Sequence, residues 1–323
     1  MCLTHKNIFL LILKIALARK FTWLNKSIMS SFSKYFIATR PWSFTASVVP
    51  VLVTAAICRI PLFSTILLRI LIMAVSVQAG ANLTNTYYDY VNGVDTKQAE
   101  NGEKTLVDKI IPESHILLLS AFLYIISIAS IFPFLIQVHN FSLFYVFLSG
   151  LLLAIFYTAQ PVGLKYLAMG DITIFACFGP LLMQCCSICF TGKTNPLLYL
   201  YSLPIGLITE NILHVNNIRD MKVDGYAGIK TLAILIGFEY SSLLYSIFFV
   251  LSYISTLYIA VFYNWGALAV FLTVPIVYDL ISQCRLGKVV GLTEETAKLH
   301  SLFGLLLFLS IYLSEKGLID VIA

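Results

Sequence analysis

Long runs of apolar residues, separated by short polar stretches, dominate the chain. At least nine runs approach the ~20 residues that a helix needs to cross a bilayer, and they are centred near residues 50, 75, 125, 150, 180, 205, 250, 272 and 305. The runs lack the period-two alternation of membrane-spanning strands, and backbone groups in lipid must be hydrogen-bonded internally. The pattern therefore predicts an all-α membrane protein, a bundle of about nine transmembrane helices.

Composition supports the same class. Of the 323 residues, 59% are hydrophobic and 11% are charged, against roughly 45–50% and about 25% in soluble domains. We expect one transmembrane domain over residues 34–315 and a short C-terminal tail over 316–323. Residues 1–33 carry an apolar stretch interrupted by lysine and arginine, and are predicted to be an N-terminal extension, either a targeting or an interfacial segment.

Basic residues predict the orientation of the bundle. If residues 40–60 form the first span, the loops after the second, fourth, sixth and eighth spans share one face with the N-terminus. Beyond residue 33, twelve lysines and arginines fall on that face and four on the other. The positive-inside rule then places the first face in the cytosol, so we expect a central cavity that opens to cytosolic loops.

Two of these cytosolic loops also carry acids, which a topology signal does not require. The stretch NLTNTYYDYVNGVD at 82–95 ends the second span, and HVNNIRDMKVDG at 214–225 ends the sixth. Asn85 and Asp89 are spaced i, i+4, as are Asn216, Asp220 and Asp224 in turn. Such spacings place side chains on one helical face, so the chain contains two similar half-sites.

The residues of the two half-sites predict a metal-bridged diphosphate. Two facing clusters of oxygen ligands repel each other unless a cation lies between them, and Mg²⁺ prefers carboxylate, amide and phosphate oxygens. Nearby basic side chains can bind the remaining phosphate oxygens. The predicted metal ligands are Asn85, Asp89, Asn216, Asp220 and Asp224, and the predicted catalytic acids are Asp89, Asp95, Asp220 and Asp224. The predicted diphosphate-binding residues are Lys104, Tyr157, Lys165, Arg219, Lys222 and Lys230.

These motifs resemble the UbiA superfamily of intramembrane prenyltransferases. RPWSF at 40–44, NTYYDYVNGVD at 85–95, LKYLAMGD at 164–171 and NNIRDMKVDGYAGIKTLAILIG at 216–237 are most similar to the animal branch that makes menaquinone-4. The resemblance spans about residues 34–315. One departure from the wider superfamily is the six-residue interval between Asp89 and the next acid, Asp95, which is similar to the naphthoquinone branch.

The resemblance implies a specific reaction. It is the Mg²⁺-dependent transfer of an isoprenyl group, geranylgeranyl above all, from its diphosphate to a naphthoquinone or naphthoquinol such as menadione, which would make menaquinone-4 (vitamin K2). Relatives imply the endoplasmic reticulum or the Golgi, while the basic, acid-free first 30 residues leave mitochondria open. Nucleic acid is not an expected partner.

Several residues inside or next to the spans have two interpretations. Glu210, His214 and Asn217 are candidates for binding the quinone acceptor, because ionisable groups within a membrane are often functional; alternatively, Glu210 and His214 are a buried pair bonded to each other. Asp171 is predicted to be the N-cap of the fifth span, with a role as a ligand as the alternative.

Other functions are weighed against quinone prenylation. A secondary transporter can also carry duplicated polar motifs, but its ion sites lie near the midplane of the membrane, whereas these acids lie at helix ends. Prenylation of another aromatic acceptor, such as 4-hydroxybenzoate in the ubiquinone pathway, and a non-catalytic prenyl-lipid sensor remain open alternatives.

Overall fold

The computed structural model describes residues 31–97, 103–137 and 141–315. Contacts divide the chain into two units, residues 1–38 and 39–323. The described element of the first unit is helix α2 (Ser31–Ala38). Most of the predicted N-terminal extension and the predicted C-terminal tail lie outside the described residues.

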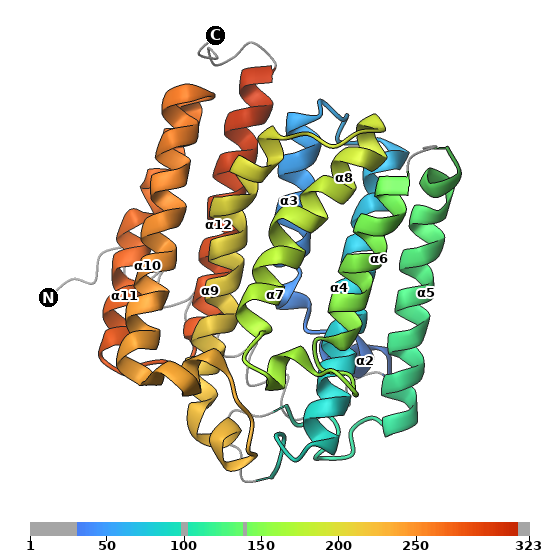
Figure 1. Cartoon of the computed structure of the whole chain (residues 1–323), viewed down its shortest axis with the longest axis vertical. Helices are drawn as coiled ribbons and strands as arrows, with labels where there is room; N and C mark the ends of the chain where they lie inside the picture. The colour runs from blue at the N-terminus through green and yellow to red at the C-terminus, as the bar shows by residue number, and fades with distance from the viewer. Residues whose placement is uncertain (1–30, 98–102, 138–140, 316–323) are drawn as a thin grey trace, which may run out of the picture. The chain divides into compact units, whose positions relative to one another are not determined.

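The second unit is a bundle of helices that run side by side (Figure 1). Its longer elements are α3 (Thr45–Ile57), α4 (Thr65–Val91), α5 (Glu113–Gln137), α6 (Phe141–Phe156), α7 (Gly170–Ala176), α8 (Leu182–Thr191), α9 (Leu197–Tyr226), α10 (Leu232–Phe262), α11 (Val274–Arg285) and α12 (Leu292–Glu315). Short 3₁₀-helices are η1 (Pro41–Ser43), η2 (Leu164–Tyr166) and η4 (Trp265–Thr273). The prediction of an all-helical membrane bundle is confirmed for the described residues.

Six segments of the described chain are long and apolar enough to cross a membrane. They are α4, α5, the α7–α8 segment, α10, the η4–α11 segment and α12, and two shorter apolar segments are Pro41–Ile57 and α6. The 30-residue α9 adds a further segment whose second half carries the polar residues of the second half-site. Each of the nine predicted apolar runs therefore corresponds to a helical segment.

The fifth predicted span is broken in the middle. A π-helix, η3 (Cys177–Leu181), which contains Pro180, joins α7 to α8. Proline cannot donate the backbone hydrogen bond that a continuous α-helix requires. At this break η3 approaches α9 closely, because a Cβ atom on Gly179 would lie 3.5 Å from the Cα of Gly206. Small residues of this kind permit tight helix packing in membranes.

Helix α9 is packed against α7, α10 and α12, while α4 packs against α3 and α5. Two apolar cores result, one centred on α9, α10 and α12 and one on α3, α4, α6 and α8. Packing in the two cores fixes the positions of α4 and α9, and with them the polar residues at their ends.

Helices α4 and α9 end in the same way. The amide of Val94 donates to the carbonyl of Asp89, and the amide of Ile229 donates to the carbonyl of Asp224. Each end contains a glycine four residues after the acid, Gly93 or Gly228, in the left-handed region at φ 72° and 73°. Glycine adopts this conformation without the Cβ penalty, which is why it ends helices. The duplication seen in the sequence therefore extends to the backbone.

Candidate active site

A polar cavity of about 230 Å³ lies where the ends of α4 and α9 meet. It is lined by residues of both half-sites together with basic residues of the neighbouring loops: Arg40, Asn85, Asp89, Asp95, Glu103, Lys104, Lys165, Asn216, Arg219, Asp220, Asp224 and Glu294, with Trp42, Val94, Val223 and Thr293. Six carboxyl groups against four basic groups leave an excess of acid, which a bound cation would balance.

Asp89 is the most strongly paired acid of the first half-site. Lys165 Nζ donates to Asp89 Oδ2 at 2.7 Å, and the hydroxyl of Tyr166 donates to Asp89 Oδ1 at 3.0 Å. Both donors belong to η2, which is anchored to the end of α6 because the Lys165 amide donates to the carbonyl of Tyr157 at 2.7 Å. Burial alone would lower the pKa of Lys165, but the charges of Asp89 and Asp224 outweigh burial and raise it. These charges therefore favour the protonated form of Lys165.

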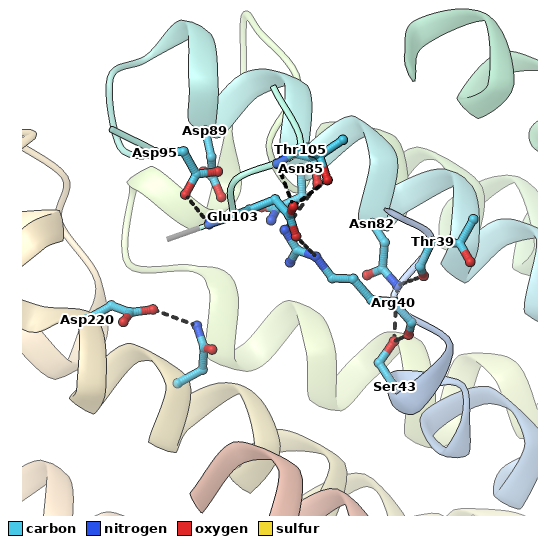
Figure 2. A network of polar contacts seen from close by, with 12 residues as sticks. Thr39, Arg40, Ser43, Asn82, Asn85, Asp89, Asp95, Glu103, Thr105 and Asp220 are labelled. Carbon is cyan, nitrogen blue, oxygen red and sulfur yellow. Dashed lines mark hydrogen bonds and ion pairs between the residues drawn. The ribbon is translucent and has the colours of Figure 1, made fainter. Parts of the chain in front are cut away.

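The loop after α4 adds Asp95 and Glu103 to the cavity (Figure 2). One oxygen of Asp95 accepts from the amide of Glu103 at 2.9 Å, while Oδ2 is buried without a hydrogen-bond partner. Burial, followed by the negative charge of Asp89, raises the pKa of Asp95 to about 6. A buried carboxylate oxygen that accepts no hydrogen bond is available to coordinate a metal ion.

Arg40 pairs with Glu103 at the edge of the same loop. Arg40 Nε lies 3.8 Å from Glu103 Oε2, and Arg40 Nη2 donates to the hydroxyl of Thr86 at 3.1 Å. Burial would raise the pKa of Glu103, but the Arg40 guanidinium and the hydrogen bonds from Thr105 outweigh burial and lower it. Glu103 therefore stays ionised, and Figure 2 shows it pointing toward Arg40.

The second half-site is organised by Arg219. Its Nε and Nη2 donate to the two oxygens of Asp220, each at 2.7 Å, and Nη2 also donates to Asn216 Oδ1 at 2.8 Å. Asn216 Nδ2 donates to Asp220 Oδ2 at 3.2 Å (Figure 2). This bidentate pairing fixes the carboxylate of Asp220. Asp224, one turn further along, is buried and lines the same cavity.

An apolar cavity of about 270 Å³ adjoins the polar one. Side chains such as Met73, Phe147 and Leu182 line it, and Tyr157 is part of its wall. Both cavities share six residues, which therefore mark the junction between them: Arg40, Trp42, Asn85, Lys165, Asn216 and Thr293.

Most predicted site residues converge, and some lie elsewhere. The five predicted metal ligands, with Asp95, Lys104, Lys165 and Arg219, line the polar cavity. Lys222 and Lys230 are exposed and are not among the residues that line either cavity. Glu210, His214 and Asn217 are buried and likewise line neither of the two cavities. Their predicted role in acceptor binding stays a prediction.

The prediction for Asp171 is wrong. Helix α7 begins at Gly170, its N-cap is Met169, and there is no side-chain cap hydrogen bond. The carboxyl group of Asp171 points instead to α9, where Asp171 Oδ1 lies 2.6 Å from His214 Nδ1. The partner of His214 is thus Asp171, although Glu210 is close by.

Arg40, Trp42 and Glu103, which line the polar cavity, and Tyr166, which binds Asp89, were not predicted as site residues from the sequence. Arg40 and Trp42 lie within RPWSF, and Tyr166 lies within LKYLAMGD. Both motifs were identified by their resemblance to the family, but the resemblance did not indicate what these side chains contact. Glu103 belongs to an acidic loop whose path cannot be read from spacing. Tyr166 could have been inferred from its neighbour Lys165, because η2 presents both side chains to Asp89.

The paired cavities suit an amphipathic ligand. The polar cavity offers carboxylate and amide oxygens for a hard cation and basic groups for an anion. The apolar cavity offers an adjoining dry wall for a hydrocarbon. A lipid with a phosphorylated head matches both.

Comparison with known proteins agrees with this geometry. The model of the UbiA prenyltransferase family matches residues 47–309. The proteins called UbiA prenyltransferase domain-containing protein 1 from Danio rerio and Dictyostelium discoideum are 35% and 36% identical, over 90% and 87% of this chain and 87% of each relative. The human protein of that name is 34% identical over 88% of this chain and 85% of its own.

Solved structures share the fold at lower identity. A UbiA homologue from Aeropyrum pernix K1 has a TM-score of 0.66 at 15% identity, covering 84% of this chain and 98% of its own. A homologue from Archaeoglobus fulgidus, solved with GPP and Mg²⁺, has a TM-score of 0.61 at 17% identity, covering 86% and 99%. Taken with the family match over most of its length, these likenesses show that the chain belongs to the UbiA prenyltransferase family.

Proposed function

We propose that this chain transfers an isoprenyl group from its diphosphate to a naphthoquinol, with Mg²⁺ as cofactor. The observation that carries the proposal is the junction of a polar cavity, lined by both half-sites, with an apolar cavity. The diphosphate belongs in the first and the prenyl chain in the second. The bond to be broken then lies near the six shared residues.

The donor set fits Mg²⁺. The polar cavity offers oxygen ligands from five residues, if each asparagine amide presents its oxygen: Asn85, Asp89, Asn216, Asp220 and Asp224. In addition, Asp95 Oδ2 is a buried oxygen that accepts no hydrogen bond. When bound, Mg²⁺ supplies positive charge that offsets the diphosphate and makes it a better leaving group. The homologue from A. fulgidus solved with GPP and Mg²⁺ supports this assignment.

The protein's own residues contribute to the same step. Breakage of the allylic C–O bond moves an electron pair onto the diphosphate, where Lys165, Lys104 and Arg219 stabilise the growing negative charge. The allylic carbon gains positive charge in a cavity with apolar walls, which keep water away from it. The electron-rich ring of the naphthoquinol forms the new C–C bond, and its ring carbon releases a proton. Products are the prenylated quinol, diphosphate and a proton.

The naphthoquinol acceptor is proposed from the form of the first motif. The interval of six residues between Asp89 and Asp95 is the feature that resembles the naphthoquinone branch. Geranylgeranyl diphosphate as donor and menaquinone-4 as product follow from the same resemblance, as does an endoplasmic reticulum or Golgi membrane.

One experiment tests the proposal. Membranes containing the chain are incubated with menadione, a reductant, Mg²⁺ and geranylgeranyl diphosphate, and menaquinone-4 is measured by mass spectrometry. Parallel arms replace menadione with 4-hydroxybenzoate or add EDTA. We expect product from menadione alone, and none in EDTA. A Glu239→Gln variant, which removes an exposed acid of α10 that lines neither cavity, serves as control. Product from 4-hydroxybenzoate alone would contradict the acceptor, and full activity in EDTA would contradict the metal.

A further inference from the structure

We propose that Asp171, Glu210 and His214 form a second cation site, distinct from the diphosphate cavity, that binds a divalent transition-metal ion such as Zn²⁺ and fastens α7 to α9. One ligand atom from each of the three side chains can be chosen so that all lie within 4.8 Å of one another. Asp171 comes from α7, whereas Glu210 and His214 are one turn apart on α9. None of the three lines the polar cavity.

The cluster contains more acceptors than donors. Both oxygens of Glu210 and Asp171 Oδ2 are buried without a hydrogen-bond partner, and Glu210 is 2% exposed. Buried polar groups are almost always paired, so such atoms call for a missing positive partner. The side chains that serve the neighbouring half-sites are already engaged, because Lys165 binds Asp89 and Arg219 binds Asp220.

The imidazole of His214 is oriented as a metal ligand. Its Nε2 lies 3.1 Å from the carbonyl oxygen of Ser241, which can only accept, so Nε2 carries a proton. The other nitrogen, Nδ1, lies 2.6 Å from Asp171 Oδ1, and a metal ion bound at Nδ1 would replace the proton that this contact shares. Metal-binding histidines characteristically donate their second ring N–H to a carbonyl or carboxylate in this way. α10, which carries Ser241, therefore supports the site from behind.

The donor set and the charge select the class of ion. One imidazole nitrogen and two carboxylates suit Zn²⁺ and similar ions, whereas Mg²⁺ prefers oxygen ligands alone. Two carboxylates and one divalent cation are also electrically neutral, which lowers the cost of burying charge in a membrane.

The position of the cluster gives the ion a structural role. A Cβ atom on Gly170, next to Asp171, would lie 3.4 Å from the hydroxyl oxygen of Tyr157, and Tyr157 forms part of the wall of the apolar cavity. An ion that joins α7 to α9 would therefore fix the wall that the hydrocarbon contacts, without touching the diphosphate.

The competing explanation is that protons, shared among the three side chains, replace the metal. The test is metal analysis of the full chain, purified in detergent with Mg²⁺ present and without any metal-affinity step. By mass spectrometry of the elements we expect about one transition-metal ion per folded chain, as in structural zinc sites. The ratio should fall several-fold in Asp171→Asn, Glu210→Gln and His214→Ala.

Two variants are matched controls for metal content. His300→Gln removes another buried imidazole, which is hydrogen-bonded to the hydroxyls of Thr45 and Thr209 and lies outside the proposed site, and Asp220→Asn removes an acid of the diphosphate cavity. Both should retain the ion. Replacement of the ion by Co²⁺ should give visible absorption bands in the wild type that His214→Ala lacks.

A folded wild-type chain with much less than one ion, or His214→Ala with an unchanged ratio, would overturn the proposal in favour of shared protons. If the variants do not fold, the metal ratio and the Co²⁺ spectrum of the wild type still decide the question. Neither readout measures prenyl transfer, so this test and that of the proposed function fail independently.

Discussion

Lys165 Nζ lies 2.7 Å from Asp89 Oδ2, and both side chains are at least nine-tenths buried. This ion pair joins the loop after α6 to the end of α4 and holds the acid of the first half-site in place. Burying two charges costs desolvation energy, which their mutual attraction offsets. Removal of one partner therefore leaves the other charge buried and uncompensated. The pair therefore has consequences for both stability and activity.

We expect Lys165→Met to lower both. An unpaired Asp89 in a buried site should cost roughly 3–5 kcal/mol of unfolding free energy. Transfer should slow by on the order of 10²-fold, because the positive charge that stabilises the leaving diphosphate is removed. Thermal unfolding in detergent and initial rates measure the two effects. Adding Asp89→Asn should restore part of the stability and none of the activity. A stable, active Lys165→Met would contradict the role of the pair.

Asp89→Asn and Asp220→Asn test whether the two half-sites act on one diphosphate. Each should lower the rate by on the order of 10²-fold or more, because each removes an electrostatic contact to the leaving group. The double variant should lose far less than the product of the single losses, since residues that act as a unit are not additive. Single-turnover rates in membranes measure this. Multiplicative losses would show independent sites.

The raised pKa of Asp95 predicts how pH affects cation binding. With a pKa of about 6 in the fold, Asp95 is increasingly protonated below that pH, and protons then compete with Mg²⁺. The Mg²⁺ concentration for half-maximal rate should rise as pH falls below about 6.

The free energy of unfolding should rise as pH falls, whereas Mg²⁺ binding weakens. Because the pKa is higher in the folded than in the unfolded chain, the contribution of Asp95 to stability is greatest below its ordinary pKa and is lost as pH rises through about 6. Asp95→Asn should flatten both dependences. Mg²⁺ titrations and unfolding midpoints at several pH values measure them, and an unchanged pH profile in Asp95→Asn would assign the effect to another group.

Close packing of α3 on α12 predicts a steric defect. A Cβ atom on Gly304 would lie 2.5 Å from Cγ2 of the buried Val49, which is far inside van der Waals contact. Gly304→Ala should therefore destabilise the bundle by about 1–3 kcal/mol, the usual cost of overpacking. Val49→Ala in the same chain should recover most of the loss, as measured by thermal unfolding. No recovery would mean that the backbone, and not Val49, resists the methyl group.

The apolar cavity predicts a limit on donor length. Gly150 lines this cavity, and a Cβ atom there would meet open space, so a larger side chain can enter without a clash. Gly150→Phe should reduce transfer from geranylgeranyl diphosphate more than transfer from geranyl diphosphate. Rates with the two donors measure the change, and Gly150→Ala is the control for the loss of glycine itself. An equal loss with both donors would place the long chain elsewhere.

Local pattern predicted much of the fold. Apolar runs of membrane length identified the spans, and the spacing of Asn216, Asp220 and Asp224 correctly predicted one helical face, because both signals depend on nearby residues. The break at Cys177–Leu181 was not predicted, because hydropathy does not distinguish an α-helix from a π-helix.

Contacts between distant segments were harder to predict. Asp171 was predicted to cap a helix, and it does lie in the first turn of α7, but its side chain pairs with His214, 43 residues away on another helix. Tyr166 and Asp89 meet because the loop after α6 folds back over the end of α4. Pairings of this kind depend on the packing of whole helices, which no single stretch of sequence records.

The junction of the two cavities has a consequence for how the products part. Before the reaction, the donor carries a charged head and an oily tail, and each is held by the compartment that matches it. Once the bond between head and tail is broken, the inorganic product is soluble in water and the organic product is soluble in lipid. Each product then has its own exit phase, so on the proposed chemistry the breaking of the C–O bond also sorts the products between water and the bilayer.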